Sequence, residues 1–312
     1  MKATTVLAKA LMAALLAAPL FAQVTPTDEK VACRNYTDVL TLFDRLDYTQ
    51  KAWTAGIREI PRVYLADVPD TWRERSAKEL SVADKKKLFF RLIAPIVLRI
   101  NELILQDRVR AKELTERLAQ GQSVSAADQT WLSELAIEYK VLGSRNEQLT
   151  TNDFAELLLR VDVVPPSLSL AQAASESGWG TSRFAAEGNA LFGQWTWGKG
   201  LKPTEQRTSA LGDYRVAAFD STAQAVYSYA LDLNTGRAYR DLRTERADLR
   251  RQGLRISGIV LAQTLVKYSE RGRAYVDDLK ALIRQNRLDD ADSASLRRMA
   301  VIHIVPAAPE PK

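Results

Sequence analysis

The chain has 312 residues, 46% of them apolar, so it is long enough for a catalytic domain with a sizeable core and an extension. Lysine and arginine outnumber aspartate and glutamate by 44 to 38, a net charge of +6 that suits an anionic partner without requiring one. Cys33 and His303 are the only residues of their kinds. A disulfide within the chain is therefore excluded. One histidine and one cysteine offer few ligands for a His/Cys zinc site and little choice for a Ser-His-Asp triad. Any hydrolysis must then rest on carboxylates, tyrosine or lysine.

Residues 1–22 have the pattern of a secretory signal peptide. Two lysines precede an apolar run from Ala10 to Phe21, and Ala22 offers a small residue for cleavage. The run is too short to span a bilayer comfortably, so we expect no stable membrane span and a periplasmic protein with a net charge of +6 − 2 = +4. The alternative is an uncleaved amphipathic start. Export argues against nucleic acid as a partner.

Residues 23–125 predict an N-terminal helical extension. The first of them, 23–35, are polar and predict a loose segment. The prolines in "REIPRVYLADVPDTW" predict irregular chain or a short extended piece. Helical spacing of apolar residues covers 36–46 and then a long helix or helix pair over 84–120, which Pro95 kinks or bounds.

Residues 126–288 predict a second, mostly helical part with one irregular insert. Helix-start patterns at Ser125 and Ser221 open two of its helices, and the prolines of "VDVVPP" separate an earlier helix from one that begins at Ser167. The stretch 178–219 is rich in glycine, tryptophan and polar residues, which predicts a loop with a small hairpin. From Asp289 to the end we expect a flexible tail. The predicted fold is mainly α.

Glu176 lies in the last turn of the helix that begins at Ser167, on the same face as Gln172. Gly178 and Gly180 suit the left-handed conformation that ends helices. The helix dipole disfavours negative charge at this end, and Trp179 can desolvate the carboxyl group. Both effects predict a raised pKa, which a general acid for a glycosidic oxygen requires.

Aromatic residues gather next to this carboxylate. Trp179, Trp195 and Trp197 are three of the six tryptophans, and Phe192 lies among them. Aromatic faces can cover the apolar side of a sugar ring while glutamine and asparagine bond its hydroxyl and acetamido groups. The alternative is that the rings form the core of a small lobe and Glu176 is a solvated charge.

The segment "LAQAASESGWGTSRFAAEGNALFGQWTW" resembles the signature of the glucosaminidase family of peptidoglycan hydrolases, glycoside hydrolase family 73, which includes the flagellar rod hydrolase domain. The resemblance reaches upstream to "VPD…KKKLFFRLIAPIVLRINELIL" and spans about residues 65–285. It implies a lysozyme-like α fold with a small β lobe. It also implies that the protein binds peptidoglycan glycan strands and cleaves the β-1,4 bond after N-acetylglucosamine, with no metal or cofactor and no amidase activity.

The same resemblance assigns roles to individual residues. Glu176 matches the catalytic acid of the family. The family's Asn-x-x-Phe-Gly segment is matched by Asn189, Phe192 and Gly193, and Gln172 and Trp179 fall within the signature. With Trp195, Trp197 and Tyr275, these residues form the expected substrate-binding set.

The second carboxylate of the family varies in position, and Glu205 is the best match, with Asp213 next. If neither carboxylate reaches the bond, the substrate's own acetamido group can act as nucleophile. Tyr268 matches a catalytic-site tyrosine, although a packed helix aromatic explains it equally well. Two rival functions stay open: a lytic transglycosylase, and a non-catalytic module that binds peptidoglycan. The sequence assigns no protein partner.

Overall fold

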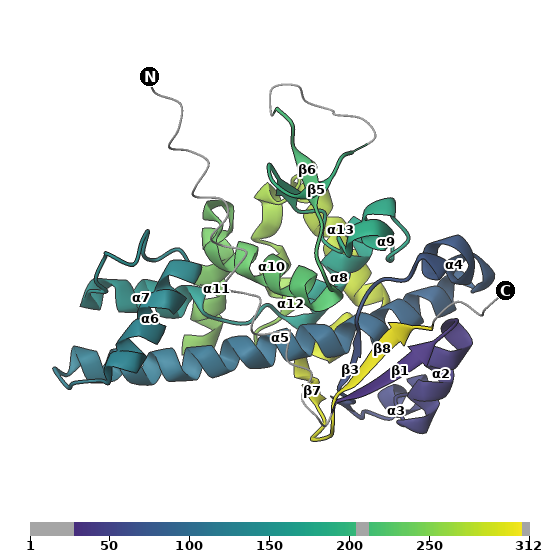
Figure 1. Cartoon of the computed structure of the whole chain (residues 1–312), viewed down its shortest axis with the longest axis horizontal. Coiled ribbons are helices and arrows are strands. Elements are labelled where there is room, and N and C mark those ends of the chain that lie inside the picture. Colours follow the sequence, from purple (N-terminus) through teal and green to yellow (C-terminus); the bar gives the residue numbers. More distant parts are fainter. Residues whose placement is uncertain (1–27, 204–211, 308–312) are drawn as a thin grey trace. The chain divides into compact units, whose positions relative to one another are not determined.

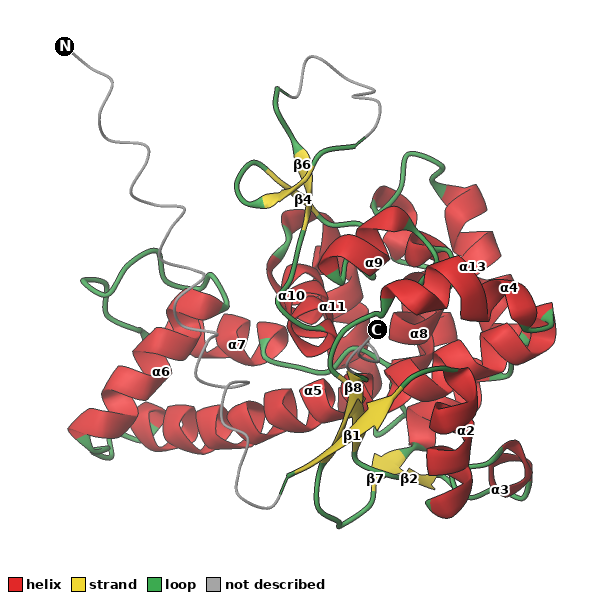
Figure 2. Cartoon of the chain, turned by 45° about the vertical axis from the view of Figure 1, so that its right-hand side comes forward, coloured by secondary structure: helices red, strands yellow, loops and turns green. Residues whose placement is uncertain are grey.

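The computed structural model describes residues 28–203 and 212–307 (Figure 1). The predicted signal peptide and Glu205 lie outside the described residues. Helices make up most of the described chain, which confirms the mainly α prediction (Figure 2). Among the described residues, no helix combines the length and the apolar character that crossing a membrane requires.

Two compact units divide the chain, and each is assembled from separate stretches of sequence. The first contains the described residues up to 96, residues 173–226 and the described residues from 296 onward. The second contains residues 97–172 and 227–295. Three of the boundaries between these stretches fall inside helices, which are α5 (Val82–Ala119), α8 (Pro166–Ser177) and α10 (Thr222–Thr235).

The first unit contains a parallel sheet of β1 (Glu29–Cys33), β8 (Ile302–Pro306) and β3 (Val63–Leu65), with β8 in the middle (Figure 1). Ile302 pairs with both Glu29 and Val63. Two predictions were therefore wrong: residues 29–33 are a strand and not a loose segment, and the expected tail from Asp289 contains η5 (Leu288–Ser293), β7 (Ser295–Leu296) and β8. A five-residue strand has little signal of its own when its partners lie more than 200 residues away.

The helices of the first unit have recognisable local causes. Asn35 caps α2 (Tyr36–Arg45), because its side-chain oxygen accepts hydrogen bonds from the backbone N–H groups of Thr37 and Asp38. Ser182 caps α9 (Arg183–Gly188) in the same way through Ala185. The other elements of this unit are α3 (Gln50–Thr54), β2 (Glu59–Ile60), the π-helical turn η1 (Trp72–Ser76) and α4 (Ala77–Glu79).

A small antiparallel sheet follows the signature segment in the first unit. It consists of β4 (Trp195–Thr196), β6 (Arg215–Ala217) and β5 (Gly200–Leu201), in that order. This agrees with the small β lobe expected from the glycine-rich and tryptophan-rich stretch. Gly200 is required where the strands meet, because a Cβ there would lie 2.4 Å from the carbonyl oxygen of Val216.

The second unit is built from helices. Its further elements are α6 (Ala126–Glu138), α7 (Thr151–Arg160), η3 (Arg237–Tyr239), α11 (Arg240–Arg251), α12 (Gly258–Ala262), η4 (Leu265–Lys267) and α13 (Arg273–Gln285). Ser125 caps α6 as predicted, and Thr150 with Asp153 forms a capping box at α7. The long α5 is one continuous helix although Pro95 removes a backbone donor from it.

A buried cluster of charges lies inside the second unit. Asp162 is 2% exposed and accepts two hydrogen bonds from Arg250, at 2.5 and 2.6 Å. Arg246, fully buried, and Arg108 bring further guanidinium nitrogens within 3.7 and 3.6 Å of it. Burial acts to raise the pKa of Asp162, but the Arg250 hydrogen bond and the neighbouring positive charges outweigh it and hold that pKa below its usual range. The second unit therefore contains an ionised carboxylate in its core.

Candidate active site

Glu176 lies in the last turn of α8 and is half-buried. The three residues Gly178, Trp179 and Gly180 that follow the helix all have left-handed backbone, with φ of 58°, 63° and 75°. The Trp179 N–H donates to the carbonyl of Ala174 at 2.9 Å, which closes the helix end. Left-handed backbone costs about 1–2 kcal/mol at a residue with a Cβ, so contacts outside the turn must hold Trp179 there.

Residues of the N-terminal extension supply those contacts. The indole Nε1 of Trp72 donates to the backbone carbonyl of Trp179 at 2.9 Å. The Trp179 ring packs edge-on against Phe89 and Phe90, with centroids 5.9 and 5.1 Å apart, and Lys86 Nζ lies 4.8 Å from its centroid. The turn next to Glu176 is thus clamped by η1 and the start of α5. The sequence pattern does not single out these residues, although the resemblance covers the "KKKLFF" segment that contains three of them.

Gly193 lies next to the carboxylate of Glu176. A Cβ added at Gly193 would lie 3.8 Å from Glu176 Oε2, and Gly193 has a φ of 60°. The structure therefore brings the Phe-Gly part of the signature together with the predicted acid. Phe192 is only 2% exposed and belongs to the core of this loop.

Asn189 holds three backbone segments together. It ends α9 in left-handed conformation, with a φ of 51°. Its side-chain oxygen accepts a hydrogen bond from the Val68 N–H at 2.8 Å. Its side-chain nitrogen donates to the Asp67 carboxylate at 3.0 Å and to the Phe219 carbonyl at 3.1 Å. Both polar atoms of Asn189 are therefore engaged inside the protein.

The small sheet presents the exposed members of the predicted set. Trp195 is 51% exposed and stacks one face on buried Tyr214 at 4.8 Å, and Trp197 is 65% exposed. Asp213 is exposed and pairs with Arg215 at 3.3 Å and Lys202 at 3.4 Å. The Arg215 hydrogen bond and the Lys202 charge hold the pKa of Asp213 below its usual range, so it is ionised at neutral pH.

The remaining predicted residues form a network inside the second unit. Gln172 is fully buried, donates to the Tyr275 hydroxyl at 3.0 Å and accepts from the Tyr229 hydroxyl at 2.6 Å. Tyr275 is 4% exposed and stacks on half-buried Tyr268, with ring centroids 5.4 Å apart and planes 5° from parallel. Tyr239 packs on Tyr268 from a centroid distance of 5.8 Å. The two tyrosines expected from the resemblance are thus brought together.

Burial divides the predicted substrate-binding residues into two groups. Trp195 and Trp197 offer exposed aromatic surface, and Trp179 and Gly193 are half-buried. The other four are buried among protein partners, and their contact with substrate stays a prediction: Gln172, Asn189, Phe192 and Tyr275. Their contacts position the residues around them.

Comparison with known proteins identifies the family of the chain. The family described as glucosaminidase, mannosyl-glycoprotein endo-beta-N-acetylglucosaminidase, matches residues 151–288, from the first residue of α7 to the first of η5. Protein bax of Escherichia coli (strain K12) is 33% identical over 227 residues, which cover 69% of this chain and 78% of that protein. No solved structure matches the chain. With the family's domain at residues 151–288 and this identity along most of its length, the chain belongs to the Bax-like family of glucosaminidases.

Proposed function

We propose that the protein is an endo-β-N-acetylglucosaminidase that hydrolyses peptidoglycan, with Glu176 as the general acid. The observation that carries the proposal is the position of Glu176. It lies in the last turn of α8 beside Gly193 and just before the turn at Trp179, which Trp72 and Phe90 clamp, within the segment that matches the glucosaminidase family. A carboxyl group on a backbone that is fixed in this way can deliver a proton to one bond of a bound glycan.

In the proposed reaction, Glu176 protonates the glycosidic oxygen that leaves N-acetylglucosamine. Water attacks the anomeric carbon, its proton passes to a base, and each cleavage creates one new N-acetylglucosamine reducing end. Asp213 is a candidate base because the hydrogen bond from Arg215 and the charge of Lys202 keep it ionised. Glu205 is the other candidate. If neither acts as the base, the acetamido group of the substrate attacks the anomeric carbon first, and water then opens the cyclic intermediate that forms.

The first test compares wild-type protein with Glu176→Gln on purified peptidoglycan. We expect the release of reducing ends to fall about 100-fold or more, the usual contribution of a general acid. Glu187→Gln is the matched control, since Glu187 is exposed in α9 of the same unit and forms an ion pair with Arg183. Wild-type activity in Glu176→Gln would overturn the proposal.

Product analysis separates the proposed reaction from its rivals. Mass spectrometry should find N-acetylglucosamine at the new reducing ends. Anhydro-muramic ends would identify a lytic transglycosylase, and tight binding without turnover would identify a binding module. Asp213→Asn, Glu205→Gln and Tyr268→Phe then show which group assists Glu176: loss of hydrolysis in one carboxylate variant names the base, and loss in neither favours the acetamido route.

We also propose that the protein works in the periplasm after removal of residues 1–22. Support comes from the basic start, the short apolar run and Ala22 in the sequence. Mass spectrometry of protein from a periplasmic extract should find a mature N-terminus at Gln23. An intact Met1 in the cytoplasmic fraction alone would contradict export.

A further inference from the structure

The parallel sheet of the first unit ends at a pocket. Strands β1, β8 and β3 run in the same direction, so their carboxyl ends at Cys33, Pro306 and Leu65 lie along one edge. Ligands of open parallel sheets bind in the crevice outside this edge. A cavity is present here, between the strand ends on one side and η1 and the start of α5 on the other.

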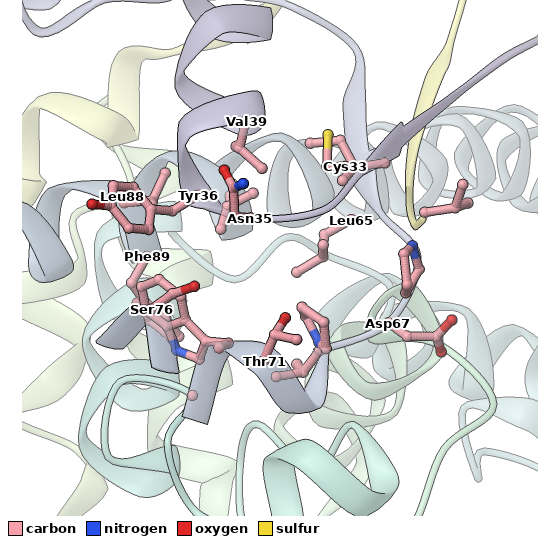
Figure 3. A pocket seen from close by; sticks show the side chains of 18 of the residues that line it. Cys33, Asn35, Tyr36, Val39, Leu65, Asp67, Thr71, Ser76, Leu88 and Phe89 are labelled. Atoms are coloured by element: carbon pink, nitrogen blue, oxygen red, sulfur yellow. The ribbon is translucent and has the colours of Figure 1, made fainter. Parts of the chain in front are cut away.

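The inner part of the pocket is an apolar chamber of about 60 Å3. In Figure 3, Asn35 and Val39 lie on one side of the space, Thr71 and Ser76 lie on the other, and Leu65 points into it. A single water molecule needs about 10–15 Å3 of such space, so the chamber accepts a group of a few heavy atoms, such as the side chain of a small apolar amino acid.

The outer part of the pocket is larger and more polar than the chamber. It has a volume of about 510 Å3 and shares Cys33, Arg34 and Asp67 with the chamber, so the two parts adjoin. Its rim carries both signs of charge, because Arg34 is a cation and Asp67 and Asp70 are anions. Such a rim complements a ligand that itself carries a carboxylate and an ammonium group.

A short peptide with small side chains combines these properties: methyl groups for the chamber, and amides, carboxylates and an amine for the rim. We propose that the pocket at the carboxyl edge of β1, β8 and β3 binds the stem peptide attached to peptidoglycan strands. This inference rests on the proposed function, because it is that function which makes a peptide-bearing glycan the substrate.

The pocket also touches the residues that hold the catalytic turn. Gly180, the last residue of that turn, and Trp72, which donates to the Trp179 carbonyl, both line the chamber. Asp67 and Val68 line both parts and are the residues that Asn189 binds. A bound peptide therefore contacts the clamp of Glu176, and cleavage should be faster on strands that carry peptides than on bare strands.

The first experiment compares kcat/KM on peptidoglycan with kcat/KM on the same glycan stripped of its peptides by an amidase. We expect a preference for the peptide-bearing form of about tenfold, the size of two exposed charge contacts. Arg34→Glu with Asp70→Lys reverses the rim and should bring this ratio close to one. The control Arg298→Glu with Glu59→Lys makes the same charge changes at exposed residues outside the pocket and should keep the wild-type ratio.

The second experiment needs no turnover and uses Cys33, the only cysteine of the chain, which lines both parts of the pocket. Burial, and then the charge of Asp38, raise the pKa of its thiol, so alkylation by iodoacetamide is measured above pH 8. In Glu176→Gln protein, a synthetic stem tetrapeptide at twice its Kd should slow alkylation about threefold by mass action. Stripped glycan should give no protection.

The two experiments separate the inference from the proposed function. Protection of Cys33 by the tetrapeptide without any cleavage by wild-type protein supports the pocket and overturns the hydrolase. Cleavage with equal rates on both substrates, together with an unprotected Cys33, supports the hydrolase and overturns the pocket. Circular dichroism and Tm of each variant verify that the charge reversals leave the fold intact.

Discussion

The two compact units use polar side chains in opposite ways. In the first unit, Trp72 and Asn189 bond the backbone of loops, and the tryptophans of the small sheet stay exposed. In the second unit, the polar groups are themselves the core: Asp162 is buried among arginines and Gln172 among tyrosines. The first unit thus fixes loops that can meet a ligand, whereas the second uses charge to fix its helices.

This difference changes how a predicted site residue should be interpreted. Gln172 and Trp197 both fall in or next to the signature segment, yet the first is fully buried and the second is 65% exposed. A residue of the first kind should affect stability when it is replaced, and a residue of the second kind should affect binding. The following four predictions test that division.

Replacing Asp162 should have the largest effect. Asp162→Asn leaves Arg246 and Arg250 with no buried counter-charge, which should lower the free energy of unfolding by about 3–5 kcal/mol. Urea denaturation measures the change. Asp241→Asn is the control, because Asp241 is exposed in α11 of the same unit. A loss below about 1 kcal/mol would show that the cluster does not hold the second unit together.

Replacing Asn189 should cost slightly less. Asn189→Ala removes three hydrogen bonds and leaves the Val68 N–H without its partner, a loss of about 3 kcal/mol. Asn189→Gly loses the same bonds but relieves the left-handed backbone, so it should be about 1 kcal/mol more stable than the alanine variant. Thermal unfolding compares the two. If the alanine variant were as stable as wild type, the hydrogen bonds of Asn189 would not contribute to stability, and the division between buried and exposed site residues would fail for Asn189.

Asp107 should make stability depend on pH through the second unit. Burial, and then the nearby charge of Glu138, raise its pKa from 3.8 to about 6. The folded state therefore binds this proton more tightly than the unfolded state, and the stabilisation is lost as pH rises through about 6. The free energy of unfolding of Asp107→Asn minus that of wild type should therefore be larger at pH 8 than at pH 5. We expect a difference on the order of 1 kcal/mol, because the group is partly exposed. The same difference in Tm at both pH values would contradict this.

Trp197→Ala should have the smallest effect on stability. With 65% of its surface exposed, its loss should change the free energy of unfolding by no more than about 0.5 kcal/mol. If it covers a sugar ring, KM for peptidoglycan should rise about fivefold at constant kcat. Trp195→Ala is the matched comparison, because it also removes the stack on Tyr214 and so should cost more stability. An unchanged KM would remove Trp197 from the substrate-binding set.

Features with a local cause could be predicted from the sequence. The end of α8 at Ser177, the left-handed glycines and the cap of α6 follow from neighbouring residues, and the structure confirms them. The clamp on Trp179 and the burial of Asp162 depend on residues more than 50 positions away, and no short-range pattern reports such contacts. The side-chain amides of Gln172 and Asn189 look suited to sugar hydroxyl groups in the sequence, but they form hydrogen bonds with protein groups that are distant in the chain.

Because β8 is the middle strand of its sheet, the first unit depends on a segment far along the chain. Residues 302–306 pair with strands that begin at residues 29 and 63, and the Ala66 N–H also donates to the carbonyl of Ile304. A chain that stops before residue 302 lacks the middle strand, leaves β1 and β3 with unpaired edges, and opens the wall of the pocket beside Trp72. This unit can therefore close only after residues 302–306 have left the ribosome, and a chain that is truncated before them exposes an aggregation-prone sheet edge.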